Sequence, residues 1–252
     1  MKSSKLVVVL GAVLLVGALG TGSVAAIQSS PQDLPAESEV GADFETTFEL
    51  TDLFDEFEEW TLVAETELEN TTWTIVQYNQ AGSETDRLET DGQNVSQSVR
   101  LDDGTATIEV RVTGVTPELD NLSYDPPDRF TVASFTQERE GGADRDIATY
   151  ESHHYTEESR EAREAIDRAS EVVAESGSDA AQSSLDSAIS AYESGNFENA
   201  IDLADRATEE AEQRQFIRTA LLGLGALVVL VLLLGGAYWV YRSRQQGPSR
   251  LR

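Results

Sequence analysis

The sequence contains no cysteine, which excludes disulfides and every form of thiol chemistry. It also lacks the G-x-S-x-G, H-E-x-x-H and Walker-type patterns that are typical of common hydrolases, zinc enzymes and nucleotide-binding enzymes. Carboxylates are so abundant that no particular pair of them stands out as an acid and a base. We therefore expect no catalytic residue and no cofactor, and an exported hydrolase is the least favoured class.

Histidine is scarce as well, because His153 and His154 are the only two and they are adjacent. Together with Glu151 or Glu157 they have the donor atoms that a metal ion needs. Structural zinc takes four ligands, however, and neighbouring residues of a strand point to opposite faces. We expect no metal site here and interpret the pair as a polar hinge between a strand and a helix.

Lysine is absent from residues 27–215, which hold 11 arginines and all 46 Asp and Glu residues, for a net charge of 11 − 46 = −35. Attraction for cations or for a basic ligand would explain the acidic excess, but it would not require lysine to disappear. The pattern resembles proteins of extreme halophiles, in which concentrated salt screens the repulsion. We expect no nucleic-acid partner, because this surface repels phosphates.

Charge is absent from residues 220–241, a run long enough to cross the roughly 30 Å apolar core of a bilayer as a helix. A buried soluble helix is the alternative, but a run this long that is apolar on all sides rarely fits a small domain. We expect a transmembrane helix over residues 216–241, with the lipid bilayer as its partner.

A second apolar run lies within residues 1–26, between two lysines and a segment of small residues, which is the pattern of a secretory signal peptide. An uncleaved anchor is the alternative. The arginines after the span predict a basic cytoplasmic tail over residues 242–252 and an extracellular N-terminal body. The expected membrane-interface anchors are Arg218, Tyr238, Trp239, Tyr241, Arg242 and Arg244.

Residues 27–40 are polar, contain two prolines and are expected to form a flexible linker. Residues 41–152 mostly alternate with period two, which predicts an antiparallel β-sandwich. Its clearest strand is 105–115, and Asp103-Gly104 predicts a two-residue hairpin turn to the strand before it. The expected core aromatics are Trp60, Trp73, Phe130 and Phe135, with ligand stacking on a tryptophan as the alternative.

The period changes to 3.6 at Thr156, and residues 156–215 predict three alanine-rich helices that break near Gly177 and Gly195. The residues Ala188, Tyr192, Gly195-Asn196-Phe197, Ala200-Ile201 and Ala207 resemble one tetratricopeptide repeat over residues 179–211. The resemblance implies a helical hairpin, although the early Trp and the closing Pro of that family are missing. A single repeat is fewer than the family's peptide-binding groove needs.

Three glycosylation sequons, at Asn70, Asn94 and Asn121, lie in the β-rich region, and the helical region has none. A sequence rich in Thr and Ser also produces such triplets by chance, so both interpretations stay open.

The predicted fold class is α+β, a sandwich followed by a three-helix bundle. Neither Gly nor Pro occurs in residues 209–218, so we expect the last helix of the bundle to continue into the transmembrane helix. The layout resembles secreted, membrane-anchored surface proteins of haloarchaea, which implies a cell-membrane location and an extracellular protein or envelope partner. The alternative is an accessory subunit that docks onto a membrane transporter or protease complex through the stalk and transmembrane helix.

Overall fold

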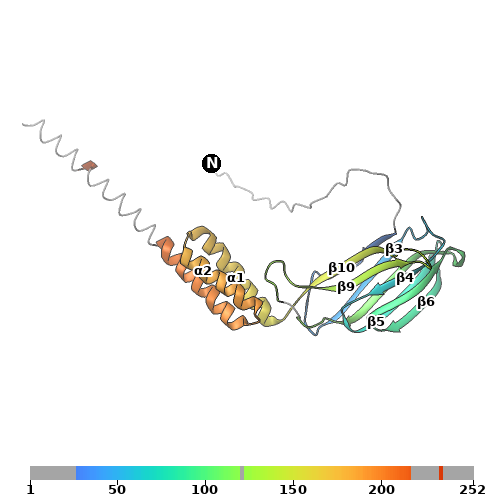
Figure 1. Ribbon diagram of the computed structural model, residues 1–252, viewed down its shortest axis with the longest axis horizontal. Coiled ribbons are helices and arrows are strands. Elements are labelled where there is room, and N and C mark those ends of the chain that lie inside the picture. The colour runs from blue at the N-terminus through green and yellow to red at the C-terminus, as the bar shows by residue number, and fades with distance from the viewer. Residues whose placement is uncertain (1–26, 120–121, 217–232, 235–252) are drawn as a thin grey trace, which may run out of the picture.

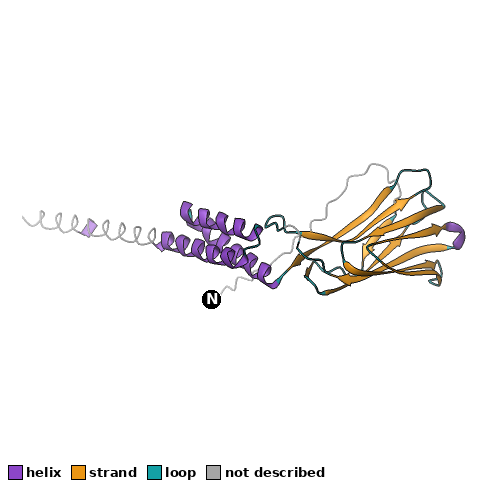
Figure 2. Ribbon diagram, turned by 60° about the horizontal axis from the view of Figure 1, so that its bottom comes forward, coloured by secondary structure: helices purple, strands orange, loops and turns teal. Residues whose placement is uncertain are grey.

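The computed structural model describes residues 27–119, 122–216 and 233–234. A β-sandwich is followed by a bundle of three helices, which projects from one end of the sandwich (Figure 1, Figure 2). The predicted α+β architecture is confirmed to this extent. The predicted signal peptide, the cytoplasmic tail and most of the predicted transmembrane helix lie outside the described residues. Within those residues, no helix is long and apolar enough to cross a bilayer.

Each layer of the sandwich is a five-stranded sheet. The first has the order β1-β3-β8-β5-β6, and the second has the order β2-β10-β9-β4-β7. Pairing within the described sheets is antiparallel, except that β2 runs parallel to β10. The strands of the first sheet are β1 (Gln28–Pro31), β3 (Asp43–Thr51), β5 (Glu69–Asn79), β6 (Glu84–Asp91) and β8 (Thr105–Val115). Those of the second are β2 (Glu37–Glu39), β4 (Glu59–Glu65), β7 (Asn94–Arg100), β9 (Arg129–Glu138) and β10 (Arg145–Tyr155).

Alternating side chains from both sheets meet in one apolar core. Phe48 on β3 bridges the layers, with its ring centroid 5.1 Å from that of Phe135 on β9 and 4.7 Å from that of Tyr150 on β10. The four predicted core aromatics are all buried. Trp60 and Trp73 are 2% and 0% exposed, so neither ring has a free face on which a ligand could stack.

The prediction of a flexible linker over residues 27–40 is wrong, because this stretch contains β1 and β2. Strand β1 pairs with β3, and β2 pairs with β10. Both lie at sheet edges, where a strand is paired on one side only and tolerates proline and polar side chains. No apolar alternation therefore marks them in the sequence.

The predicted hairpin at Asp103-Gly104 is also wrong, because β7 and β8 belong to opposite sheets. The chain crosses between the layers through a short 3₁₀ helix, η1 (Leu101–Asp103), and Gly104 at φ 72°. The left-handed backbone explains the glycine. An Asp-Gly pair predicts a tight reversal, but it does not say which strand the next one will join.

The bundle consists of α1 (Glu157–Ser176), α2 (Asp179–Glu193) and a third helix over residues 197–216. Thr156 and Ser178 cap the N-termini of the first two helices. Gly177 and Gly195 have positive φ and lie where the first and second helices end, as the sequence predicts. The buried face is mostly alanine, whose short side chain allows close helix packing. The third helix runs away from the sandwich (Figure 1).

Candidate functional site

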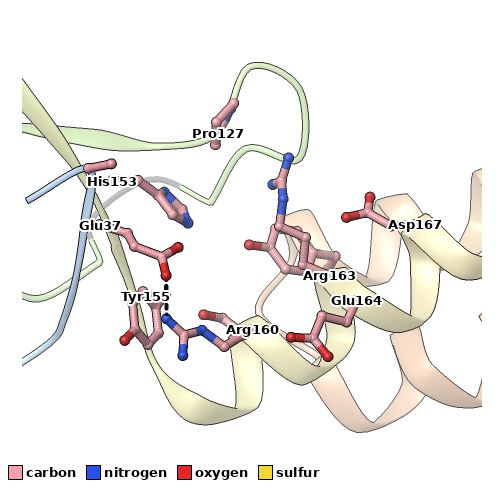
Figure 3. A pocket seen from close by; sticks show the side chains of 11 residues that line it. Glu37, Pro127, His153, Tyr155, Arg160, Arg163, Glu164 and Asp167 are labelled. Atoms are coloured by element: carbon pink, nitrogen blue, oxygen red, sulfur yellow. Dashed lines mark hydrogen bonds and ion pairs between the residues drawn. The ribbon is translucent and has the colours of Figure 1, made fainter. Parts of the chain in front are cut away.

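A cleft of about 430 Å³ lies where the sandwich meets the bundle. It is lined by residues of β2, β10, α1, α2 and the loop that precedes β9. Figure 3 shows Arg160 reaching from α1 toward Glu37 and Tyr155, Arg163 reaching from α1 toward the loop that carries Pro127, and His153 on β10 on the other side of the cleft. Two of the few arginines of an acidic chain thus lie in one cleft, where carboxylates of β2 and α1 accompany them.

The chain enters the cleft by passing from a strand to a helix across a single residue. β10 ends at Tyr155, and Thr156 caps α1 in extended conformation. The Thr156 hydroxyl accepts from the Ser159 amide at 3.1 Å, and Ser159 Oγ accepts from the Thr156 amide at 2.9 Å. This reciprocal cap stabilises the first turn of α1. Ser159 Oγ also donates to the Thr156 carbonyl at 3.0 Å, so its proton is already engaged.

Arg160 ties the start of α1 to the sandwich. Its Nη2 donates to Glu37 Oε1 on β2 at 2.9 Å, and its guanidinium carbon lies 3.5 Å from the centroid of the Tyr155 ring. The ion pair is exposed and contributes at most about 1 kcal/mol. It joins the first turn of α1 to β2.

The loop between β8 and β9 reaches the bundle through Tyr124. The Tyr124 hydroxyl donates to Asp167 on α1, and its ring lies edge-on to Tyr192 on α2 at 6.1 Å. The guanidinium carbon of Arg163 lies 4.8 Å from the Tyr124 ring centroid. Nη1 of Arg163 is buried and finds no acceptor among the described residues, so the aromatic face offsets part of its lost hydration.

Asp128 and the two histidines anchor the base of the same loop. His153 Nδ1 donates to the Asp128 carbonyl at 2.7 Å. His154 is buried. Its Nδ1 lies 3.1 Å from the Pro117 carbonyl oxygen, and its Nε2 lies 3.3 Å from Oδ2 of Asp128. Both neighbours are hydrogen-bond acceptors. His154 thereby joins the two ends of the loop.

The predicted polar hinge at His153 and His154 is therefore wrong, because both residues belong to β10 and pair with β2, and His153 pairs with β9 as well. The sandwich extends to Tyr155, three residues beyond its predicted end. Sequence reasoning did not find Tyr124, Asp128, Arg160 or Arg163 as site residues. They come from distant segments, and no spacing in the sequence indicates that they meet.

Tyr124 provides a spectroscopic test of the loop contact. Burial, and then the hydrogen bond to Asp167, raises the pKa of Tyr124 well above its ordinary value. Because the pKa of Tyr124 is higher in the folded than in the unfolded protein, its contribution to stability is complete at pH values below the unfolded pKa of about 10. The contribution is lost as the pH rises through the folded pKa. We expect one of the seven tyrosines to ionise last in an absorbance titration at 295 nm.

Replacing Tyr124→Phe should remove that last step and leave less stability to lose above about pH 10. The matched control is Tyr78→Phe, at the other end of the sandwich, which should retain the late step. A late step that survives in Tyr124→Phe would show that another tyrosine is responsible.

The polar atoms of the cleft are thus used mainly to join two units. Within the described ranges, no group of three His, Cys, Asp or Glu residues could hold a metal ion. Of the predicted site residues, Asn70 and Asn94 lie exposed on β5 and β7. Asn121 and the interface anchors Arg218, Tyr238, Trp239, Tyr241, Arg242 and Arg244 lie outside the part of the chain that the structure describes.

Comparison with known proteins finds only distant structural resemblances. No protein family and no curated protein matches the sequence. The sporulation control protein Spo0M from Bacillus subtilis is 12% identical over 57% of this chain and 56% of its own, with a TM-score of 0.29. A mutant of the SrpA adhesin from Streptococcus sanguinis is 16% identical over 54% and 61%, with a TM-score of 0.25. The chain thus covers little more than half of each of these structures, and at such TM-scores neither carries a functional argument.

Proposed function

We propose that this is a non-catalytic, single-pass cell-surface protein of a halophile. In this proposal, residues 1–26 direct export, residues 216–241 cross the membrane and residues 242–252 remain in the cytoplasm. The acidic sandwich and the helical stalk are presented outside the cell to a protein or envelope partner. The evidence from the sequence is the uncharged run 220–241, the arginines that follow it and the acidic, lysine-free middle.

One structural observation supports the proposal most strongly, namely the direction of the third helix. It starts beside the sandwich and runs away from it, and its last described residue, Phe216, lies four positions before the apolar run (Figure 1). Residues 197–216 span about 30 Å as a helix. The sandwich therefore lies at the opposite end of the bundle from Phe216, and the proposed anchor follows Phe216 in the sequence.

The contacts in the cleft support presentation in a fixed orientation. Thr156 is the only residue between β10 and α1, and the Arg160–Glu37 and Tyr124–Asp167 contacts add two further attachments. A sandwich attached in this way keeps its direction relative to the bundle. Its end farthest from the bundle carries η1, with Leu101 45% exposed (Figure 2).

The lack of cysteine makes a clean topology test available, since any introduced thiol is the only one. We expect Leu101→Cys, expressed in the full-length protein, to react with a membrane-impermeant maleimide on intact cells in molar salt. Ser249→Cys in the tail should react only after the cells are opened. Equal labelling of both variants on intact cells, or labelling of Ser249→Cys alone, would contradict the proposal.

A cysteine-directed photo-cross-linker distinguishes the two proposed roles. Adducts with an extracellular or envelope protein from Leu101→Cys support presentation of the sandwich. Adducts from Arg168→Cys on α1 to a membrane protein with many spans, with none from Leu101→Cys, would instead favour the accessory subunit. Arg168 is the matched position, because its side chain is also exposed.

A further inference from the structure

We propose that Asn70 and Asn94 are N-glycosylation sites that place two glycans at the end of the sandwich that faces the bundle. The inference rests on the proposed export of the sandwich. It goes beyond the sequence motifs, because the fold brings two separate sequons to one border of the molecule.

The hydrogen-bond register places both asparagines at the bundle-facing end. Glu69 at the start of β5 is opposite Val115 at the end of β8. The next residue, Thr116, accepts a hydrogen bond from the Gly41 amide, and the neighbouring Val40 amide donates to the Tyr155 carbonyl. Asn94 starts β7, opposite Glu65 at the end of β4. Tyr155 is the last residue before the cap of α1, so this rim is the one from which the bundle projects.

A single turn connects the two sites. The Gly92 amide donates to the Thr71 carbonyl at 3.0 Å, and the Thr66 amide donates to the Gln93 carbonyl at 2.9 Å. Asn70 is adjacent to Thr71 in the chain, and Asn94 is adjacent to Gln93. The turn is fixed further by the Trp73 indole, which donates to the Gly92 carbonyl at 3.0 Å. Both asparagines therefore lie beside one hydrogen-bonded turn that joins the two sheets.

Both side chains are accessible for modification. Asn70 and Asn94 are exposed, and neither side-chain amide has a hydrogen-bond partner among the described residues. Ser96, the hydroxyl residue of the second sequon, is exposed too, and Thr72, that of the first, lies half-buried with its hydroxyl on Asp91 at 2.7 Å. An enzyme that reads the triplet thus meets the asparagine and the hydroxyl residue on the surface.

Backbone conformation alone explains part of this pattern. Asn70 has φ 49°, a left-handed value that asparagine tolerates better than most residues. Asn79 gives the contrast, since its side chain accepts from the amides of Ala81 and Ser83 in a turn at the other end of β5. Asn79 has no hydroxyl residue two positions later, whereas both asparagines at the rim do. Backbone conformation explains why asparagine occurs at such a position, but it does not explain the hydroxyl residue two positions later.

The reaction requires a sugar donor of one chemical class, an oligosaccharide linked through its anomeric carbon to a polyprenyl phosphate or diphosphate. The side-chain Nδ2 forms a bond to the anomeric carbon, and the bond between that carbon and the phosphate oxygen breaks. The lipid phosphate leaves with the bonding electrons, and the amide nitrogen loses one proton to the transferase. The product is an N-linked glycan on each asparagine.

The test is mass spectrometry of the full-length protein isolated from the membranes of a halophilic host that N-glycosylates exported proteins. We expect a glycan mass on the peptides that contain Asn70 and Asn94. Asn70→Gln and Asn94→Gln should each remove one glycan, and the double variant should remove both. Asn79→Gln is the matched control and should change nothing.

Variants of the hydroxyl residues separate glycosylation from a structural role of the asparagine. Thr72→Ser keeps the triplet and should retain the glycan, whereas Thr72→Val keeps Asn70 and should lose it. Unmodified Asn70 and Asn94 in protein whose Leu101→Cys variant is labelled on intact cells would overturn the inference and leave the proposed export intact. Failure of that labelling would instead count against the export itself.

Discussion

Lowering the NaCl concentration from about 2 M to about 0.1 M should lower the melting temperature of the full-length protein by about 10 °C. Two like charges about 8 Å apart in water repel by about 0.5 kcal/mol, and the screening length grows from a few Å in molar salt to about 10 Å at 0.1 M. Residues 27–215 carry a net charge of −35, so many such pairs gain strength together. Circular dichroism melts across a salt series measure the effect.

The register of the first sheet identifies one source of this repulsion. Glu49 on β3 and Glu109 on β8 stand directly opposite each other, and like charges in that position are destabilising. Glu49→Gln should therefore raise stability at low salt by about 0.5 kcal/mol and have little effect in 2 M NaCl. Glu65→Gln is the matched control, because Glu65 stands opposite Asn94 and Ser134 and should gain less. A melting temperature that stays constant across the salt series, or rises equally in sucrose, would refute screening as the cause.

Truncating Phe48→Ala should cost about 3–5 kcal/mol of sandwich stability, the range typical of a fully buried Phe. Phe48 is 0% exposed and contacts rings on two strands of the opposite sheet, so its loss leaves a cavity between the layers. The melting transition of the sandwich should fall by about 10 °C or more.

The exposed residue Leu101 provides the control for this substitution. Leu101→Ala removes an apolar side chain that is 45% exposed, and its effect should stay within about 0.5 kcal/mol. Urea unfolding followed by tryptophan fluorescence reports on the sandwich, since Trp60 and Trp73 both lie in its core. A loss below about 1 kcal/mol for Phe48→Ala would show that the two sheets close over the vacated space.

The sequence predicted those elements whose pattern is set by burial. The alternation over residues 105–115 predicts the bounds of β8, and in its middle the alternate residues Ile108, Val110 and Val112 are buried in the core. The same reasoning cannot find β6, an edge strand of its sheet whose residues are all polar except Leu88. It cannot find β1 or β2 either, since these edge strands are held by backbone hydrogen bonds that leave no trace in the side-chain pattern.

The cleft lay beyond the reach of sequence reasoning for a different reason. The cap at Thr156 was predictable, because capping involves neighbours within one turn. The contact between Tyr124 and Asp167 joins segments 43 residues apart and has no periodicity. His154 illustrates the same limit, since its partners Pro117 and Asp128 meet it only after β8, β9 and β10 are in place.

The passage from β10 into α1 across Thr156 also determines how the sandwich bears mechanical load. A pull through the bundle enters the sandwich along β10, which is flanked by β9 on one side and β2 on the other. The ladder to β9 extends from Arg145 to His153, and its hydrogen bonds lie across the pulling direction. Those bonds are loaded together in shear and do not open one by one as in a zipper. A force applied through the bundle can therefore pull β10 out of its sheet only if many of its hydrogen bonds to β9 break at once.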